Sequence, residues 1–132
     1  MRKPVVVMPG QALPEGEAGP VTQTDIVRFA GAGGDFNPLH HDPVFAANAG
    51  FPGVLAMGQF HAGLLGSWLT DWCGVEHLRE YEVRFVAPVF LGDLLRFTGE
   101  VTAVGDGVAE LALRASRDDD QVIRATARIV VS

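Results

Sequence analysis

Hydrophobic positions in the middle of the chain recur every three or four residues and predict one long helix, from about Ala56 to Trp72. The members of this apolar stripe are Met57, Phe60, Leu64, Leu65, Trp68, Leu69 and Trp72. Glycines at 58, 63 and 66 weaken a helix individually but permit close packing. Since polar residues and glycines interrupt the stretch from Phe51 to Trp72, we expect a buried helix and no membrane span.

Beyond Gly74 the pattern changes to alternation with many β-branched residues, which predicts strands. The expected strands are Tyr81–Val86, Leu94–Val104, Val108–Ser116 and Val122–Val131. The turn residues Gly105–Gly107 and Asp118–Asp120 predict hairpins between the last three. One long helix followed by an antiparallel meander that wraps around it is an α+β architecture.

The first third of the chain predicts shorter elements. We expect a strand at Val5–Met8 and then a helix whose N-cap is Thr22 or Thr24. The inward-facing residues of that helix should be Ile26, Val27 and Ala30. Pro43 at a first helical position should begin a short helix, which Gly50 ends.

Length and charge favour one compact domain, residues 1–132, without a nucleic-acid partner. Lys and Arg number 10 and Asp and Glu number 16, which gives a net charge of −6 and leaves no basic cluster for a phosphate backbone. The single cysteine, Cys73, cannot form an internal disulfide, and no charged-then-apolar leader precedes Pro4. We therefore expect a cytoplasmic protein.

Residues 34–42 read Gly-Asp-Phe-Asn-Pro-Leu-His-His-Asp and place a carboxylate, Asp35, five positions before an imidazole, His40. Pro38 fixes its own φ and pushes Asn37 towards extended geometry, so the segment should be a rigid loop. A carboxylate and an imidazole aimed at one volume could hold a water and move its proton. The alternative is that Asp35 is a turn former or caps the short helix that follows.

The segment from Ile26 to Leu65, which contains this loop, resembles the MaoC-like dehydratases, also called R-specific enoyl-CoA hydratases. The similarity continues through Val83–Phe85 and Pro88–Asp93. The resemblance implies a single hot-dog domain, an antiparallel sheet wrapped around a long central helix. It also implies a hydro-lyase that needs no cofactor and reversibly hydrates trans-2-enoyl thioesters of CoA or acyl carrier protein to (R)-3-hydroxyacyl thioesters.

The resemblance assigns roles to four residues of this chain. Asp35 and His40 carry over as the catalytic pair that activates water. The backbone N–H of Gly58 faces the thioester oxygen as the oxyanion donor, and Asn37 shapes the loop in a supporting role. The chain departs from the family where Met57 replaces the usual histidine of Ala-His-Gly-Met, and where Gly66 stands in place of a serine found in some relatives.

Other readings of the same motifs stay open. The chain could be a catalytic or accessory subunit of a heteromeric acyl dehydratase that acts on fatty-acid or sterol side chains. It could instead be a hot-dog thioesterase, although such enzymes more often carry an acidic residue on or just before the long helix, or a non-catalytic acyl-binding subunit. Hot-dog domains work as dimers or higher assemblies, so we expect a homodimer or larger homo-oligomer, with a heteromer as the alternative.

The remaining histidines, the cysteine and the arginines receive structural or charge-based predictions. Adjacent side chains on an extended loop point apart, so His40 and His41 should not chelate one ion and we expect no metal site. His61 could face a partner chain or the pocket, but we expect a satisfied buried histidine. His77 should lie on the surface, and Cys73 should be a small buried hydrophobe. By charge alone, the candidates for contacting the phosphates of the carrier are Arg79, Arg84, Arg96 and Arg114.

Overall fold

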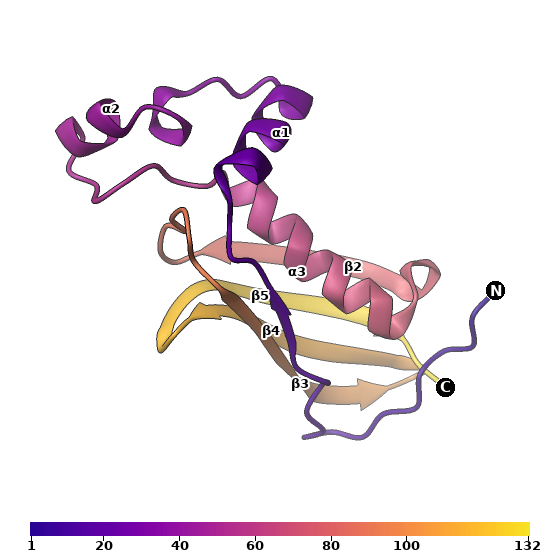
Figure 1. Ribbon diagram of the computed structural model, residues 1–132. Coiled ribbons are helices and arrows are strands. Elements are labelled where there is room, and N and C mark those ends of the chain that lie inside the picture. Colours follow the sequence, from indigo (N-terminus) through magenta and orange to yellow (C-terminus); the bar gives the residue numbers. More distant parts are fainter.

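The computed structural model describes residues 1–132 as a five-stranded antiparallel sheet with a long helix across one face (Figure 1). The strands are β1 (Gly16–Ala18), β2 (Leu78–Phe85), β3 (Leu95–Gly105), β4 (Val108–Arg117) and β5 (Asp120–Val130). They lie in the order β1-β3-β4-β5-β2, so β1 and β2 form the two edges. The helices are α1 (Gln23–Gly33), α2 (Pro43–Asn48) and α3 (Gly58–Cys73), with short 3₁₀ turns η1 (Pro38–His40) and η2 (Val75–His77).

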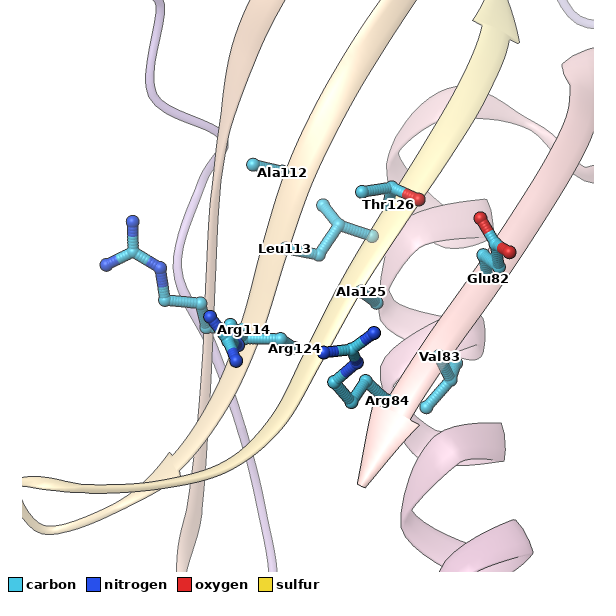
Figure 2. A pocket seen from close by; sticks show the side chains of 9 residues that line it. All are labelled: Glu82, Val83, Arg84, Ala112, Leu113, Arg114, Arg124, Ala125 and Thr126. Carbon is cyan, nitrogen blue, oxygen red and sulfur yellow. The ribbon is translucent and has the colours of Figure 1, made fainter. Parts of the chain in front are cut away.

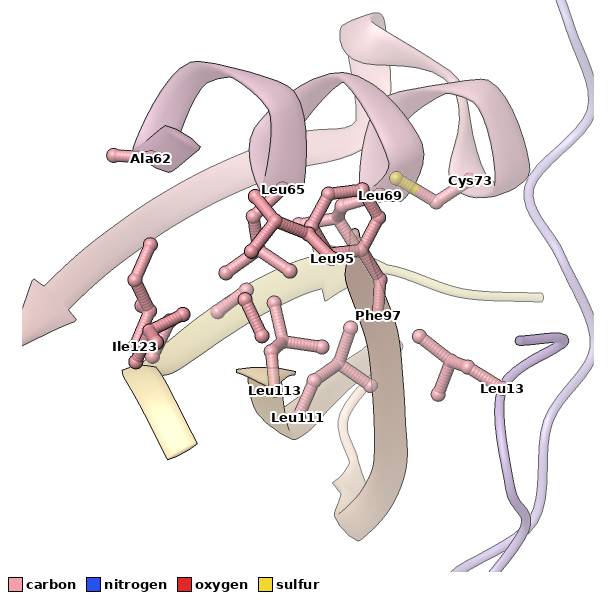
Figure 3. Close-up of a cluster of buried hydrophobic side chains, with 14 of the residues drawn as sticks. Leu13, Ala62, Leu65, Leu69, Cys73, Leu95, Phe97, Leu111, Leu113 and Ile123 are labelled. Carbon is pink, nitrogen blue, oxygen red and sulfur yellow. The ribbon is translucent and has the colours of Figure 1, made fainter. Parts of the chain in front are cut away.

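The core lies between α3 and the sheet (Figure 3). Leu65, Leu69 and Cys73 of α3 are fully buried against the strands. The strand residues that meet them include Leu95, Phe97, Leu111, Leu113 and Ile123, which come from alternate positions of β3, β4 and β5. This period of two gives each strand one buried and one exposed face. The predicted α+β architecture and the burial of Cys73 are confirmed.

The connection between α1 and α3 forms a separate region beyond the N-terminal end of α3 (Figure 1). It contains η1 and α2, and it is tied to the start of α3 by the N–H of Leu55, which donates to the carbonyl of Leu39 at 2.9 Å. α1 begins at a capping box, since Thr22 and Asp25 exchange side-chain to backbone hydrogen bonds. Thr22 is therefore the N-cap.

The prediction of a strand at Val5–Met8 is wrong, and the sequence did not predict β1 at Gly16–Ala18. Val5 contributes one carbonyl, to the N–H of Ser132, and the N–H of Met8 bonds the side chain of Gln11, so no ladder forms there. β1 pairs with Leu95–Phe97 in only three residue pairs, too short a segment for alternation to be visible.

Two predicted exposures are also wrong. Val27 lies 53% exposed because it falls beside the narrow buried stripe of Ile26 and Ala30 on an 11-residue helix. His77 is buried, at 5% exposure, because the N-terminal segment covers it: its Nε2 lies 2.6 Å from the carbonyl oxygen of Arg2. That contact spans 75 positions, so nothing near His77 in the sequence indicates it.

Candidate active site

Asp35 and His40 meet in the loop between α1 and α2. Asp35 Oδ2 lies 3.3 Å from His40 Nε2, with side-chain exposures of 49% and 11%. α1 ends at Gly34, whose φ of 70° is left-handed and turns the chain sharply, and the N–H of Asp35 then bonds the carbonyl of Ala30 at 3.0 Å. The predicted proximity of this carboxylate and imidazole is therefore present in the structure.

Asn37 gives the loop its shape. Its Oδ1 accepts a hydrogen bond from the N–H of Leu39 at 3.0 Å and so caps η1, whose first residue is Pro38. The N–H of Asn37 donates to Asp35 Oδ1 at 3.3 Å, and the N–H of His40 donates to the Asn37 carbonyl at 3.0 Å. Asn37 thus contacts both members of the pair through its backbone, and Asn37, not Asp35, caps the short helix.

A backbone carbonyl from outside the loop fixes the imidazole of His40. His40 Nδ1 lies 2.8 Å from the carbonyl oxygen of Leu55, and because a carbonyl only accepts, Nδ1 must carry the hydrogen. The neutral ring then presents an unprotonated Nε2 to the carboxylate of Asp35. Two acceptors 3.3 Å apart require either a shared proton or a water molecule beside them that donates to both, which is the arrangement that proton transfer needs.

Sequence reasoning missed the residues that hold His40 in place. Besides Leu55, the side chain of Gln23 on α1 donates to the backbone carbonyl of His40 at 3.2 Å. The motif gave no signal for either contact, since one donor lies 17 positions away and the acceptor is a backbone group 15 positions away.

Gly58 begins α3 and leaves backbone donors free. Met57 provides no side-chain cap, and the N–H groups of Gly58 and Gln59 have no hydrogen-bond partner in the chain. Free N–H groups at a helix N-terminus attract negative charge. A Cβ on Gly58 would lie 2.9 Å from the ring of Phe85, so the space that glycine leaves is filled by this aromatic ring.

A hollow of about 500 Å³ lies beside the start of α3. It is lined by Ala56, Gly58, Gln59, His61, Phe85, Val86, Ala87 and Pro88. The structure therefore brings Asp35, Asn37 and His40 together, and places Gly58 in an adjoining hollow. Leu55 and Ala56 connect the loop to the hollow, because the Leu55 carbonyl bonds His40 and the next residue, Ala56, lines the hollow.

His61 is the one buried side chain whose polar atom lacks a partner. It is 2% exposed, as predicted, but its Nδ1 makes no hydrogen bond, so the prediction that it is satisfied is wrong. Burial lowers the pKa of His61 to about 4 and keeps the ring neutral. The ring packs edge-on against Phe85 at 5.9 Å between centroids, next to the hollow.

The four arginines suggested by charge do not surround the Asp35–His40 pair. The guanidinium of Arg79 donates to the carbonyls of Glu76 and Leu78 beside η2. Arg84, Arg96 and Arg114 lie on exposed positions of β2, β3 and β4 that alternate with the core-facing residues. None of the three forms a hydrogen bond or an ion pair with the loop that carries Asp35 and His40.

A sheet wrapped around one long helix, with a carboxylate–imidazole pair at the N-terminal end of that helix, defines a hot-dog domain of the hydratase type. Residues 5–120 match the family described as MaoC like domain, so the chain belongs to that family. None of its helices has the length and apolar character needed to cross a bilayer.

Two named relatives are each 37% identical to this chain over the aligned residues. The (R)-specific enoyl-CoA hydratase of Aeromonas caviae is 37% identical over 109 residues, which cover 80% of this chain and 71% of the relative. The 3-hydroxyacyl-thioester dehydratase X of Mycobacterium tuberculosis is 37% identical over 94 residues, which cover 71% of this chain and 32% of that longer protein. The chain thus spans about a third of the latter.

Solved structures of hydratases and of a related complex share the fold of this chain. A chain of the ChsH1-ChsH2 complex from Mycobacterium tuberculosis superposes with a TM-score of 0.84 at 28% identity, covering 96% of this chain and 100% of that one. The R-hydratase PhaJ1 from Pseudomonas aeruginosa superposes with a TM-score of 0.83 at 27% identity, and the match covers 95% of this chain and 82% of PhaJ1. The predicted family and fold are confirmed.

Proposed function

We propose that this chain reversibly hydrates trans-2-enoyl thioesters of CoA or acyl carrier protein to (R)-3-hydroxyacyl thioesters. The observation that carries the proposal is the 3.3 Å approach of Asp35 Oδ2 to His40 Nε2, with the opposite ring nitrogen held by the Leu55 carbonyl. The similarity to the Aeromonas caviae hydratase supports it. Residues 1–132 would act as one domain and need no cofactor.

The geometry supports a mechanism in which one water molecule bridges Asp35 and His40. Its oxygen adds to Cβ of the enoyl group as a proton passes to the pair, and the pair returns a proton to Cα on the same side. Negative charge then develops on the thioester oxygen and needs donors that are already in place. The free N–H groups of Gly58 and Gln59 are our candidates, and the dipole of α3 adds positive potential there.

The first experiment is to follow the loss of enoyl absorbance when the purified chain is mixed with crotonyl-CoA and with longer enoyl-CoAs. We expect turnover and an (R)-3-hydroxyacyl-CoA product on chiral analysis. Both hydration and thioester hydrolysis remove this absorbance, so free thiol is measured in parallel: release of thiol in step with the loss of absorbance would instead identify a thioesterase. The (S)-product would contradict the proposed site.

A second candidate function is that of one subunit in a heteromeric dehydratase. The similarity to a chain of the two-component ChsH1-ChsH2 complex favours it. Under this alternative the chain alone would show no turnover, and activity would appear on co-expression with a second hot-dog chain. A chain active by itself would rule the obligate heteromer out.

We also propose that the protein is a cytoplasmic dimer. Cys73 is the only cysteine and is buried, which fits a reducing compartment. β2 is an edge strand of eight residues whose outer side pairs with nothing in the chain, and pairing it with a second hot-dog chain would extend the sheet. The partner would be a second copy or, under the alternative above, a different chain.

A further inference from the structure

Three arginines lie beside one another on the face of the sheet that is turned away from α3. Arg84 of β2 stands opposite Arg124 of β5, and Arg124 stands opposite Arg114 of β4 on its other side. Figure 2 shows the three side chains across the neighbouring strands. All three are exposed, whereas the residues that flank Arg114 and Arg124 along their strands are buried. We call these three residues the arginine row.

The charges of the arginine row are poorly compensated. Arg84 and Arg124 form no hydrogen bond or ion pair in the chain, and Arg114 has only Glu100 at 4.0 Å, with both side chains more than half exposed. Like charges directly opposite each other on adjacent strands destabilise a sheet. A net charge of −6 shows that the arginine row is not a by-product of a basic composition.

Another arginine on the same face shows the usual arrangement. Arg128 of β5 stands in register between Glu110 of β4 and Glu80 of β2, and its guanidinium lies 3.4 Å from Glu80. Opposite charges therefore alternate across the strands there. Arg124 lies four residues before Arg128 on the same strand, and there the three residues side by side all carry positive charge.

Space for a ligand lies directly beside the arginine row. A hollow of about 500 Å³ is lined by the three arginines together with Ala112 and Thr126, whose short side chains leave room, and by Glu82 at the β2 side. Adjacent strands are about 4.8 Å apart, so the arginine row spans roughly 10 Å. That width accommodates more than one phosphate group.

We propose that the arginine row binds a diphosphate group, either as the free anion or within a nucleotide. Guanidinium groups match phosphate oxygens with pairs of N–H donors, and they are less strongly hydrated than an ammonium ion. A bound diphosphate would also remove the repulsion within the arginine row and so stabilise the sheet. The site is separate from Asp35 and His40, and the inference does not depend on the proposed function.

Isothermal titration of the whole chain with sodium pyrophosphate at low ionic strength tests the proposal. We expect saturable binding of one anion per chain, weakened about tenfold or more by Arg124→Thr, since a charge-assisted bond is lost. Arg128→Thr is the matched control: it removes the same charge from the same strand and face, and should change the affinity less than about twofold. Glu82→Gln should tighten binding.

Thermal unfolding gives an independent readout that a loss of folding cannot imitate. Arg124→Thr should raise the Tm of the free protein, because cross-strand repulsion is relieved, and should abolish most of the Tm increase caused by pyrophosphate. Arg128→Thr should not raise the Tm. Absence of saturable pyrophosphate binding at millimolar concentration, or an equal loss of affinity in both arginine variants, would overturn the proposal.

Titrations with ADP and with coenzyme A separate the possible sources of the diphosphate. The contribution of the arginine row is the part of the affinity that Arg124→Thr removes. If Arg124→Thr weakens the binding of pyrophosphate, ADP and coenzyme A by the same factor, the site recognises only the diphosphate. A larger part for one nucleotide would identify it as the preferred source, and either result supports the site.

Discussion

At the scale of single residues, the activity should depend on one proton position between Asp35 and His40. Asp35→Asn removes the charge that holds a protonated ring, and His40→Ala removes the base, so we expect turnover to fall by at least about 10²-fold in each variant. His41→Ala is a suitable control, because His41 is exposed and the one hydrogen bond of its ring is to the carbonyl of Phe36 at 3.4 Å. Near-normal turnover in Asp35→Asn would contradict the mechanism.

His61 should make stability depend on acid pH. Its pKa is lowered to about 4 in the folded chain and is near 6.5 in the unfolded chain, so the unfolded state binds a proton first as the pH falls. The stability contribution is present above pH 6.5 and is lost between about pH 6.5 and 4, by up to about 3 kcal/mol. His61→Leu should flatten this part of the stability curve, measured by urea unfolding at several pH values. An unchanged curve would show that other groups control it.

The proximity of Asp35 and His40 could be predicted from sequence, because both lie in one short loop and Asn37 and Pro38 leave that loop few ways to fold. The contacts that orient His40 could not be predicted. Its acceptor is the backbone carbonyl of Leu55, and a backbone group carries no residue-type signal. The same limit explains His77, whose burial depends on a carbonyl at the far N-terminus.

At the scale of elements, the position of β1 is set by α3 and not by local pattern. The indole N–H of Trp68 donates to the carbonyl of Pro14 at 3.1 Å, and its ring packs over Gly16 so closely that a Cβ there would overlap the indole. The helical stripe predicted Trp68 as a packing residue, but nothing in it indicated which segment would cross the ring. Long elements with clear periodicity, such as α3 and β3 to β5, were therefore predictable where β1 was not.

A substitution at Gly16 tests this contact. Gly16→Ala should destabilise the chain by about 1–3 kcal/mol, because the new methyl group must displace the indole or the strand. Gly31→Ala provides the opposite case: Gly31 lies inside α1 with no atom near its Cβ position, so alanine should stabilise by up to about 1 kcal/mol. Urea unfolding measures the free energy of unfolding of both variants. An equal change in the two would contradict the contact between β1 and Trp68.

At the scale of the whole molecule, the chain leaves apolar surface uncovered near the candidate site. Phe36, Val44 and Phe45 of the α1–α3 connection are 70%, 70% and 46% exposed, and Phe85 at the end of β2 is 50% exposed. Exposed apolar groups that gather on one part of a surface mark contacts with another molecule. A partner on β2 and an acyl chain at the site would both reduce this exposure.

Assembly should therefore be coupled to activity. We expect sedimentation of the purified chain to give a species with the mass of two chains, because an unpaired eight-residue edge strand next to apolar side chains favours association. Turnover per chain should then fall on dilution below the dissociation constant, since the exposed side chains near the site lose their partner. A monomer with full turnover at every concentration would contradict the dimer. A monomer that gains turnover only with a second hot-dog chain would instead identify this chain as one subunit of a heteromer.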